Sequence, residues 1–220
     1  MTWRQHRGGK RWRVLETGYI EVADDGIIRT KGAPTSVRGL RSEYGDLIEA
    51  AAAAFAIPVE WIYGMIPIEA GRLESDRTRF DPVSIRYEPG YVHPSDTPHR
   101  VSAGLMQTLV STARQMAEKY GLELRDMDGD PRDVQLGDLL DPHTSLWLGA
   151  AYMAHQRDRY AGELDGGEGL DFVYLTGAYN AGSVRTDVDT PFRLMTYSPT
   201  RTERAIRFHN DAVAIGRGEP

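Results

Sequence analysis

One stretch of the chain is apolar on nearly every side of the helix that it would form. It lies between Pro58 and Glu69, and its apolar side chains are Trp61, Ile62, Met65, Ile66 and Ile68. A helix without a polar face must be enclosed by other elements, so we expect the core to form around it. Pro58 suits the first turn of such a helix, whereas Pro67 is expected to kink or end it.

Other segments repeat apolar residues at three- and four-residue spacing, which is typical of helices with one buried face. The expected helices cover residues 35–57, 102–120, 143–160, 172–179 and 202–215. Thr35 or Ser36 is a candidate N-cap for the first helix, and Gly121 is a natural stop for the second. Residues 71–101 contain four prolines and show no clear period, so we expect a long loop there. The predicted fold class is therefore mainly α.

The first 33 residues differ in character, and we expect a division into segment 1–33 and a domain of residues 34–220. The segment holds short runs of β-branched and aromatic residues, and Asp25-Gly26 between two of them is a hairpin signal. These runs, at residues 12–16, 19–23 and 27–30, predict a small β-ribbon. Residues 1–13 are basic and carry no acid, so they form either a flexible tail or an arm that docks on a partner.

The composition argues against several functional classes. A net charge of −6 disfavours nucleic-acid binding, and the absence of cysteine excludes disulfides and thiolate metal sites. No apolar run approaches the roughly 20 residues of a membrane-spanning helix, and no apolar region follows the basic start, so we expect no Sec signal peptide. His93, Asp96 and His99 lack a known ligand spacing, and the turn at residues 126–130 lacks the glycine and glutamate of a calcium loop. No metal or cofactor is predicted.

Three short strings carry a family resemblance. Residues 66–71 read Ile-Pro-Ile-Glu-Ala-Gly, residues 102–107 read Ser-Ala-Gly-Leu-Met-Gln, and residues 177–182 read Gly-Ala-Tyr-Asn-Ala-Gly. In this order they resemble the soluble lytic transglycosylase family, which is related to goose-type lysozymes, over about residues 34–215. The resemblance implies a lysozyme-like helical fold and an enzyme that cleaves the MurNAc-β-1,4-GlcNAc bond in the glycan strands of peptidoglycan.

Phage-encoded and prophage-encoded members resemble this chain in further places. These are residues 86–91, 98–102 and 208–213. The likeness implies a protein of the virion tail that acts in the bacterial cell wall or periplasm. Tail or baseplate proteins would then be partners through the N-terminal segment, and removal of residues 1–31 is expected to spare the activity. A mainly structural tail component with vestigial activity is the alternative.

The resemblance implies a catalytic glutamate at the end of the apolar helix, which is the place of Glu69. Apolar surroundings and a helix C-terminus both disfavour an ionised carboxyl, which suits a group that must donate a proton. Glu74 is the runner-up, because Glu74-Ser75 reproduces the family's Glu-Ser pair whereas Ala70 follows Glu69. We prefer Glu69, since Glu74 lies in a charged, hydrated stretch.

One carboxyl can suffice for a lytic transglycosylase, because the 6-hydroxyl of MurNAc closes onto its own C1 and leaves a 1,6-anhydro end. A hydrolysing muramidase instead needs a second carboxylate that activates water. Glu88 is the candidate for this auxiliary role, with an ion pair to Arg86 or another neighbour as its alternative.

The resemblance also implies a set of residues that shape the substrate cleft. Gln107 suits the N-acetyl groups of the sugars, and Met106 offers an adaptable contact to a sugar face. Tyr179 is expected to hydrogen-bond the catalytic carboxyl, while Asn180 contacts substrate or caps a helix. A structural role in the core remains the alternative for each. The full predicted binding set is Ser102, Gly104, Met106, Gln107, Tyr179 and Asn180.

Overall fold

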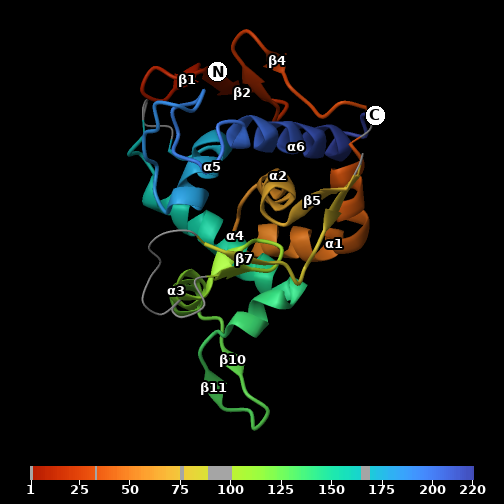
Figure 1. The fold of residues 1–220 in the computed structure, drawn as a ribbon, viewed down its shortest axis with the longest axis vertical. Helices are drawn as coiled ribbons and strands as arrows, with labels where there is room; N and C mark the ends of the chain where they lie inside the picture. The colour runs from red at the N-terminus through yellow and green to blue at the C-terminus, as the bar shows by residue number, and fades with distance from the viewer. Residues whose placement is uncertain (1, 33, 75–76, 89–100, 165–168) are drawn as a thin grey trace.

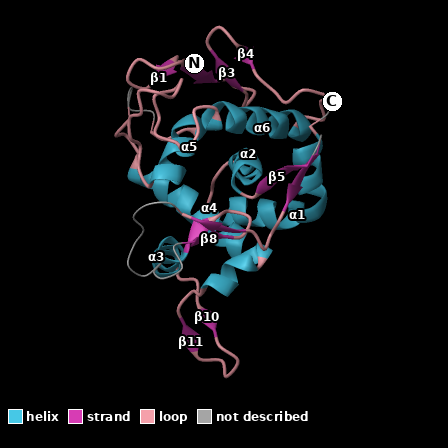
Figure 2. Ribbon diagram, viewed as in Figure 1, coloured by secondary structure: helices cyan, strands magenta, loops and turns pink. Residues whose placement is uncertain are grey.

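The computed structural model of the chain describes residues 2–32, 34–74, 77–88, 101–164 and 169–220, without the side chains of residues 72–79. Within this part, helices dominate and small sheets lie around them (Figure 2). The helices are α1 (Thr35–Ala54), α2 (Val59–Glu69), α3 (Val110–Tyr120), α4 (Pro142–Arg159), α5 (Phe172–Ala181) and α6 (Arg201–Gly216), with a 3-10 helix, η2 (Leu136–Leu140), before α4. The predicted mainly α class is confirmed.

The apolar stretch forms α2, which occupies the middle of the molecule. Figure 1 shows it end-on, and it packs chiefly against α1 and α6. The approach is closest at Gly64, where an added Cβ would lie 2.5 Å from the Phe172 ring and 3.1 Å from Cβ of His209. Pro58 is the N-cap as expected, but Pro67 lies inside the helix, which continues to Glu69. The last turn of α2 therefore presents Glu69 at its end.

The N-terminal segment is a four-stranded antiparallel sheet in the order β1-β2-β3-β4. Its strands are β1 (Arg4–Gln5), β2 (Arg11–Val14), β3 (Ile20–Val22) and β4 (Gly26–Ile27). The predicted ribbon is thus present, but the expected flexible tail is wrong from Arg4 onward. The reason is burial: Arg4 and Trp12 are 7% and 0% exposed, and the Trp12 ring meets those of Tyr174 and Phe192 at 5.0 and 6.0 Å.

Helix α6 lies between this sheet and α2 (Figure 1). Asn210 on α6 joins the layers, because its amide donates to the carbonyls of Ile20 and Ile28 at 2.8 and 2.9 Å. Its Oδ1 accepts from the backbone N–H of Ile20 at 2.8 Å. Sheet and helices share one apolar cluster. The division at residue 33 into a docking segment and a catalytic domain stays a prediction.

Two expectations about the middle of the chain need correction. The expected loop at residues 71–101 contains strands β5 (Gly71–Glu74), β6 (Arg77–Phe80), β7 (Ile85–Tyr87) and the start of β8 (Val101–Ala103). These strands could not be recognised from the spacing of apolar residues, because many of their residues are polar. Strands β5 and β6 pair with each other as a two-stranded sheet. The expected helix over residues 102–120 begins only at Val110, after β8, a turn and β9 (Thr108–Leu109). Gly121 ends it in the left-handed conformation, as predicted.

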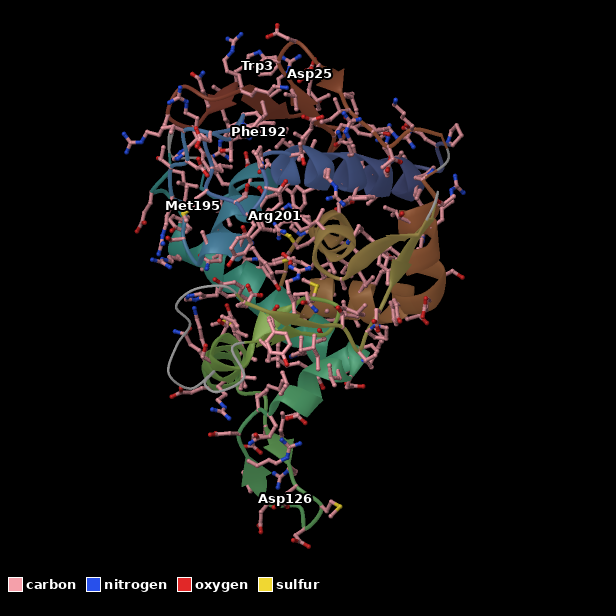
Figure 3. The ribbon with its side chains drawn as sticks, viewed as in Figure 1. Trp3, Asp25, Asp126, Phe192, Met195 and Arg201 are labelled. Carbon is pink, nitrogen blue, oxygen red and sulfur yellow. The ribbon has the colours of Figure 1, made fainter. Side chains whose placement is uncertain are left out.

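The other helix boundaries lie within a few residues of those expected. Pro34 is the N-cap of α1, so Thr35 and Ser36 are not capping residues. Strands β10 (Leu124–Arg125) and β11 (Pro131–Arg132) form a hairpin at the end of the molecule opposite the N-terminal sheet, where Figure 3 labels Asp126. The side chain of Asp126 accepts from the backbone N–H groups of Asp128 and Asp130, which makes this a polar turn. No helix in the described ranges is long and apolar enough to cross a membrane.

Candidate active site

A cavity of about 680 Å³ opens beside the end of α2. Segments that are far apart in the sequence meet in its wall: the end of α2, β7, the turn before α3, the end of α5 and the loop before α6. The lining residues used below are Glu69, Arg86, Glu88, Gln107, Tyr179, Asn180, Arg185, Asp187, Met195 and Tyr197. The three strings that carried the resemblance therefore contribute to one site.

Glu69 combines burial with access to this cavity. Its side chain is 5% exposed, yet it belongs to the cavity wall. One carboxylate oxygen forms an ion pair with Arg201 at the start of α6, and the other lies 3.6 Å from Nη1 of Arg86 on β7. Arg86 also donates to the backbone carbonyl of Glu69. Two cations thus converge on the one carboxyl that ends the central helix.

The turn between β8 and β9 forms one side of the cavity, because its last residue, Gln107, lines it. Gly104 and Gln107 have φ of +78° and +47°, a conformation that glycine adopts without strain and other residues rarely adopt. An added Cβ at Gly104 would lie 1.9 Å from the carbonyl oxygen of Leu139, so the turn sits directly on η2. At Gly149 on α4 an added Cβ would lie 2.4 Å from Met106, so this helix also touches the turn closely. The Gly-Leu-Met-Gln string is therefore a packed turn and not the start of a helix.

Ser102, Gln107 and Glu88 form a hydrogen-bonded chain at the cavity wall. The hydroxyl of Ser102 lies 2.6 Å from a Glu88 oxygen and 3.1 Å from the Gln107 carbonyl oxygen. The Gln107 amide donates to the carbonyls of Ser84 and Gly104 at 3.0 and 2.8 Å. Gln107 thus ties the turn to the segment before β7. Glu88 contacts Ser102 here, while Arg86 pairs with Glu69, so the expected Glu88–Arg86 pair is not formed.

Tyr179 and Asn180 end α5 at the opposite wall. The Tyr179 hydroxyl donates to the Met106 carbonyl at 2.8 Å, in place of the expected bond to the catalytic carboxyl. Burial, and then the nearby negative charge of Glu69, raise the pKa of Tyr179 above its ordinary value, so it stays a neutral donor. Asn180 accepts from the backbone N–H of Tyr197 at 3.0 Å, which fixes the loop before α6. Both residues hold the walls of the cavity in place.

Residues 46–190 match the family described as Transglycosylase SLT domain. The chain belongs to this family. Two solved structures share its fold: the 70 kDa soluble lytic transglycosylase from Escherichia coli, with a TM-score of 0.51 and 18% identity, and an inactive mutant of the lytic transglycosylase Slt from Pseudomonas aeruginosa, with a TM-score of 0.50 and 15% identity. The alignments cover 80% and 84% of this chain but only 25% and 28% of those proteins. No curated protein sequence matches the chain.

Membership in the SLT family confirms the lysozyme-like fold, and the structure places most of the predicted residues at one site. Glu69, Glu88, Gln107, Tyr179 and Asn180 line the cavity, and Ser102 lies next to it through Glu88. Their roles stay predictions.

Other predicted residues lie elsewhere or outside the description. Met106 is fully buried and faces α4, so a contact to a sugar face is not available to it. Glu74 is the last residue of β5, and its side chain is not among those described. His93, Asp96 and His99 lie outside the described residues.

Several residues of this site were not predicted from the sequence, among them Arg86, Arg201, Met195 and Tyr197. Arg201 is 132 positions from its partner Glu69, and no local pattern marks such a pairing. It also lies outside residues 46–190, which match the family, and in none of the three strings that carry the resemblance. Met195 and Tyr197 are 43% and 64% exposed and stand in a loop that has no periodic pattern. Their exposed apolar side chains were the signal that could have indicated them.

Proposed function

We propose that this SLT domain is a peptidoglycan lytic transglycosylase that cleaves the MurNAc-β-1,4-GlcNAc bond, with Glu69 as its acid and base. The observation that carries the proposal is that Glu69 is a buried carboxyl that still lines a large cavity. The Gly-Leu-Met-Gln turn and the end of α5 supply the walls around it. A cavity with a few convergent polar groups is the usual form of a small-molecule or glycan site.

In the proposed reaction, Glu69 protonates the glycosidic oxygen as the C1–O bond breaks. The resulting carboxylate then accepts the proton of the MurNAc 6-hydroxyl while the oxygen of that hydroxyl bonds to C1. One carboxyl serves both steps, and the product has a 1,6-anhydroMurNAc end. The polar walls, with Gln107 and Asn180, would orient the sugar rings so that the leaving oxygen meets Glu69.

A hydrolysing muramidase is the second candidate, because a second carboxylate lines the same cavity. Glu88 accepts from Ser102 at 2.6 Å and lies 3.5 Å from the Tyr197 hydroxyl. Such anchoring suits a carboxylate that holds an attacking water. In that case Glu88→Gln would abolish the reaction, whereas a transglycosylase would lose only binding or positioning.

Digestion of purified sacculi, with mass spectrometry of the products, tests both candidates. We expect 1,6-anhydro ends from the wild type and none from Glu69→Gln, with Glu49→Gln on the exposed face of α1 as the matched control. Reducing ends that depend on Glu69 and Glu88 would instead identify a hydrolase. Absence of any release by a folded wild type would leave the vestigial structural role.

The proposed setting is a phage or phage-like tail that opens the cell wall locally. Its support is the sequence likeness of residues 86–91, 98–102 and 208–213 to phage-encoded members. The N-terminal sheet offers an exposed surface for tail partners, with Trp3 stacked against Arg13 at 4.7 Å. Proteomics of purified virions, with the tail fraction separated from the head fraction, is the measurement. Recovery of the protein only from the lysate would refute the tail location.

A further inference from the structure

The two arginines on Glu69 differ in how firmly they are held. The side chain of Arg201 is 8% exposed and points into the interior, where Figure 3 labels it. The side chain of Arg86 is 42% exposed and belongs to the cavity wall. Arg201 is therefore a fixed part of the core, whereas Arg86 is within reach of a ligand.

The pair between Arg86 and the Glu69 carboxylate is loose. Its 3.6 Å separation exceeds the roughly 2.7–2.9 Å of a charge-assisted hydrogen bond. Partly exposed ion pairs contribute little, with a median near ~0–1 kcal/mol, so a competing carboxylate can replace the Glu69 carboxylate at Nη1 of Arg86 at low cost. Nη2 of the same guanidinium donates to the backbone carbonyl of Glu69, so the exchange concerns the contact at Nη1. The guanidinium has five N–H donors in a rigid planar arrangement, so two of them can bind the two oxygens of one carboxylate.

The proposed acid step sets a requirement on this arrangement. Glu69 must meet the glycosidic oxygen before it can donate a proton to it, and one of its carboxylate oxygens faces Arg86 at 3.6 Å. Withdrawal of Arg86 would free that oxygen for the substrate. Arg201 would remain and would keep the carboxyl in its place at the end of α2.

We propose that Arg86 is a binding site for a carboxylate of the substrate, and that this carboxylate takes Arg86 away from Glu69. The inference rests on the proposed function and gives it a substrate class, which is glycan strands that bear carboxylates. In peptidoglycan such groups occur on the lactyl ether of peptide-free MurNAc and on the stem peptide. Binding of the correct strand thereby prepares Glu69 for its acid step, whereas a neutral strand leaves the resting ion pair intact.

The other charges in the cavity make Arg86 distinct. Arg185 is exposed in the same wall and donates to Ser183 at 2.9 Å, and the structure records no contact between it and Glu69 among the described residues. Glu88 and Asp187 also line the cavity and would repel an anionic ligand. A general attraction of anions would therefore depend on both arginines, whereas the proposed exchange depends on Arg86 alone.

The test compares matched substrates on four proteins: wild type, Arg86→Gln, Arg86→Lys and Arg185→Gln. Peptide-bearing strands and peptide-free strands are each used in the native form and after chemical amidation of their carboxylates. We expect the wild type to prefer the native form by about tenfold in kcat/KM, which is the scale of one hydrogen bond to a charged group. Arg86→Gln should remove this preference, Arg86→Lys should keep part of it, and Arg185→Gln should leave it unchanged.

The pattern of preference identifies the carboxylate. A preference on peptide-free strands assigns the lactyl group, and one confined to peptide-bearing strands assigns the stem peptide. Equal ratios for the wild type and Arg86→Gln, or loss of the preference in Arg185→Gln as well, would overturn the proposal.

If Arg86→Gln is folded but inactive on every strand, the Kd values of native and amidated strands, measured by calorimetry, decide between the outcomes. If it does not fold, the Arg86→Lys ratio decides. A wild type without activity on any strand would refute the proposed function and not the binding site, which calorimetry still tests.

Discussion

Two buried carboxylates with arginine partners lie at helix ends, Asp171 at the start of α5 and Glu69 at the end of α2, and their surroundings differ. Asp171 caps α5, where its oxygens accept from Arg4, from the Trp12 indole and from the Tyr174 backbone at 2.7–3.0 Å. Glu69 ends α2, where one oxygen meets Arg201 and the other has only a loose contact to Arg86. Their side chains are similarly buried, at 10% and 5% exposed.

The comparison shows that burial beside an arginine does not by itself mark a catalytic group. Asp171 is enclosed by tight donors and has no place in the cavity wall, so it stabilises the fold. Burial raises the pKa of Asp171, against the lowering effects of Arg4 and Trp12. Glu69 lines the cavity and has one loosely held oxygen, and this difference supports the proposal that it is the reactive carboxyl.

The largest expected effect separates the two carboxylates by activity. Glu69→Gln should lower turnover of peptidoglycan by roughly 10³-fold, because loss of a general acid costs about 10²–10⁴. Asp171→Asn should keep most of the turnover at a temperature where it is folded. Muropeptide release with circular dichroism of the same samples checks this. A folded Asp171→Asn protein that is as inactive as Glu69→Gln would break the comparison.

A measurement of stability should show a large effect at the Asp171 ion pair, where activity shows a small one. Arg4→Met leaves Asp171 buried without its counter-ion, which is expected to lower the free energy of unfolding by about 3–5 kcal/mol. The control is Arg11→Met, because Arg11 is exposed on the neighbouring strand. Urea titrations give both values, and equal stability of the two variants would contradict the role of Asp171. For the same reason, removal of residues 1–31 is expected to destabilise the chain, so the predicted retention of activity should be measured at a temperature where the shortened chain is folded.

His209 on α6 is a buried group that makes the stability of the fold depend on pH. Burial beneath Phe172 lowers the pKa of His209 from 6.5 to about 4. The unfolded chain therefore binds more protons between these values, so stability is full above pH 6.5 and falls as the pH drops toward 4. The loss attributable to His209 is roughly 3 kcal/mol.

Urea titrations at pH 7.5 and 4.5 measure this loss. His209→Gln should reduce the difference between the two pH values, whereas His143→Gln, at an exposed position on α4, should not. An unchanged difference in His209→Gln would mean that carboxyls with a lowered pKa in the folded chain, such as Asp138 beside Arg132, carry the acid sensitivity.

The smallest effect concerns the wall beside Glu69. Tyr179→Phe removes the bond to the Met106 carbonyl, which should cost about 1 kcal/mol in stability. Activity should fall only a few-fold, because the hydroxyl supports the turn and does not bond the Glu69 carboxyl. Thermal unfolding and muropeptide release check both. A loss of activity as large as that of Glu69→Gln would show that Tyr179 takes part in the reaction directly.

The sequence allowed the regular helices to be predicted and not the links between them. The helix before Glu69 could be predicted, because a helix that is apolar on nearly every side must be enclosed by other elements. The turn at residues 104–107 was read as helix, since Leu105, Met106 and Leu109 have helical spacing while their backbone is not helical. The positive φ of Gln107 depends on its bonds to Ser84 and Gly104, which no local pattern reports.

The site divides in the same way. Short strings revealed Glu69, Gln107, Tyr179 and Asn180, because their residues are contiguous with recognisable neighbours. Arg201 and the loop with Tyr197 could not be found, since they meet Glu69 and Asn180 only through the tertiary fold. The sequence thus provides the candidate for the reactive group, and the structure shows which charges lie beside it.

The absence of a side chain at Gly149 has a consequence for protein engineering. Because Met106 occupies the space that any larger residue would need, the turn and α4 behave as one part. A designer who transfers this cavity to another helical scaffold must therefore move the helix surface around Gly149 together with the turn. Even an alanine at position 149 would require Met106 to shift.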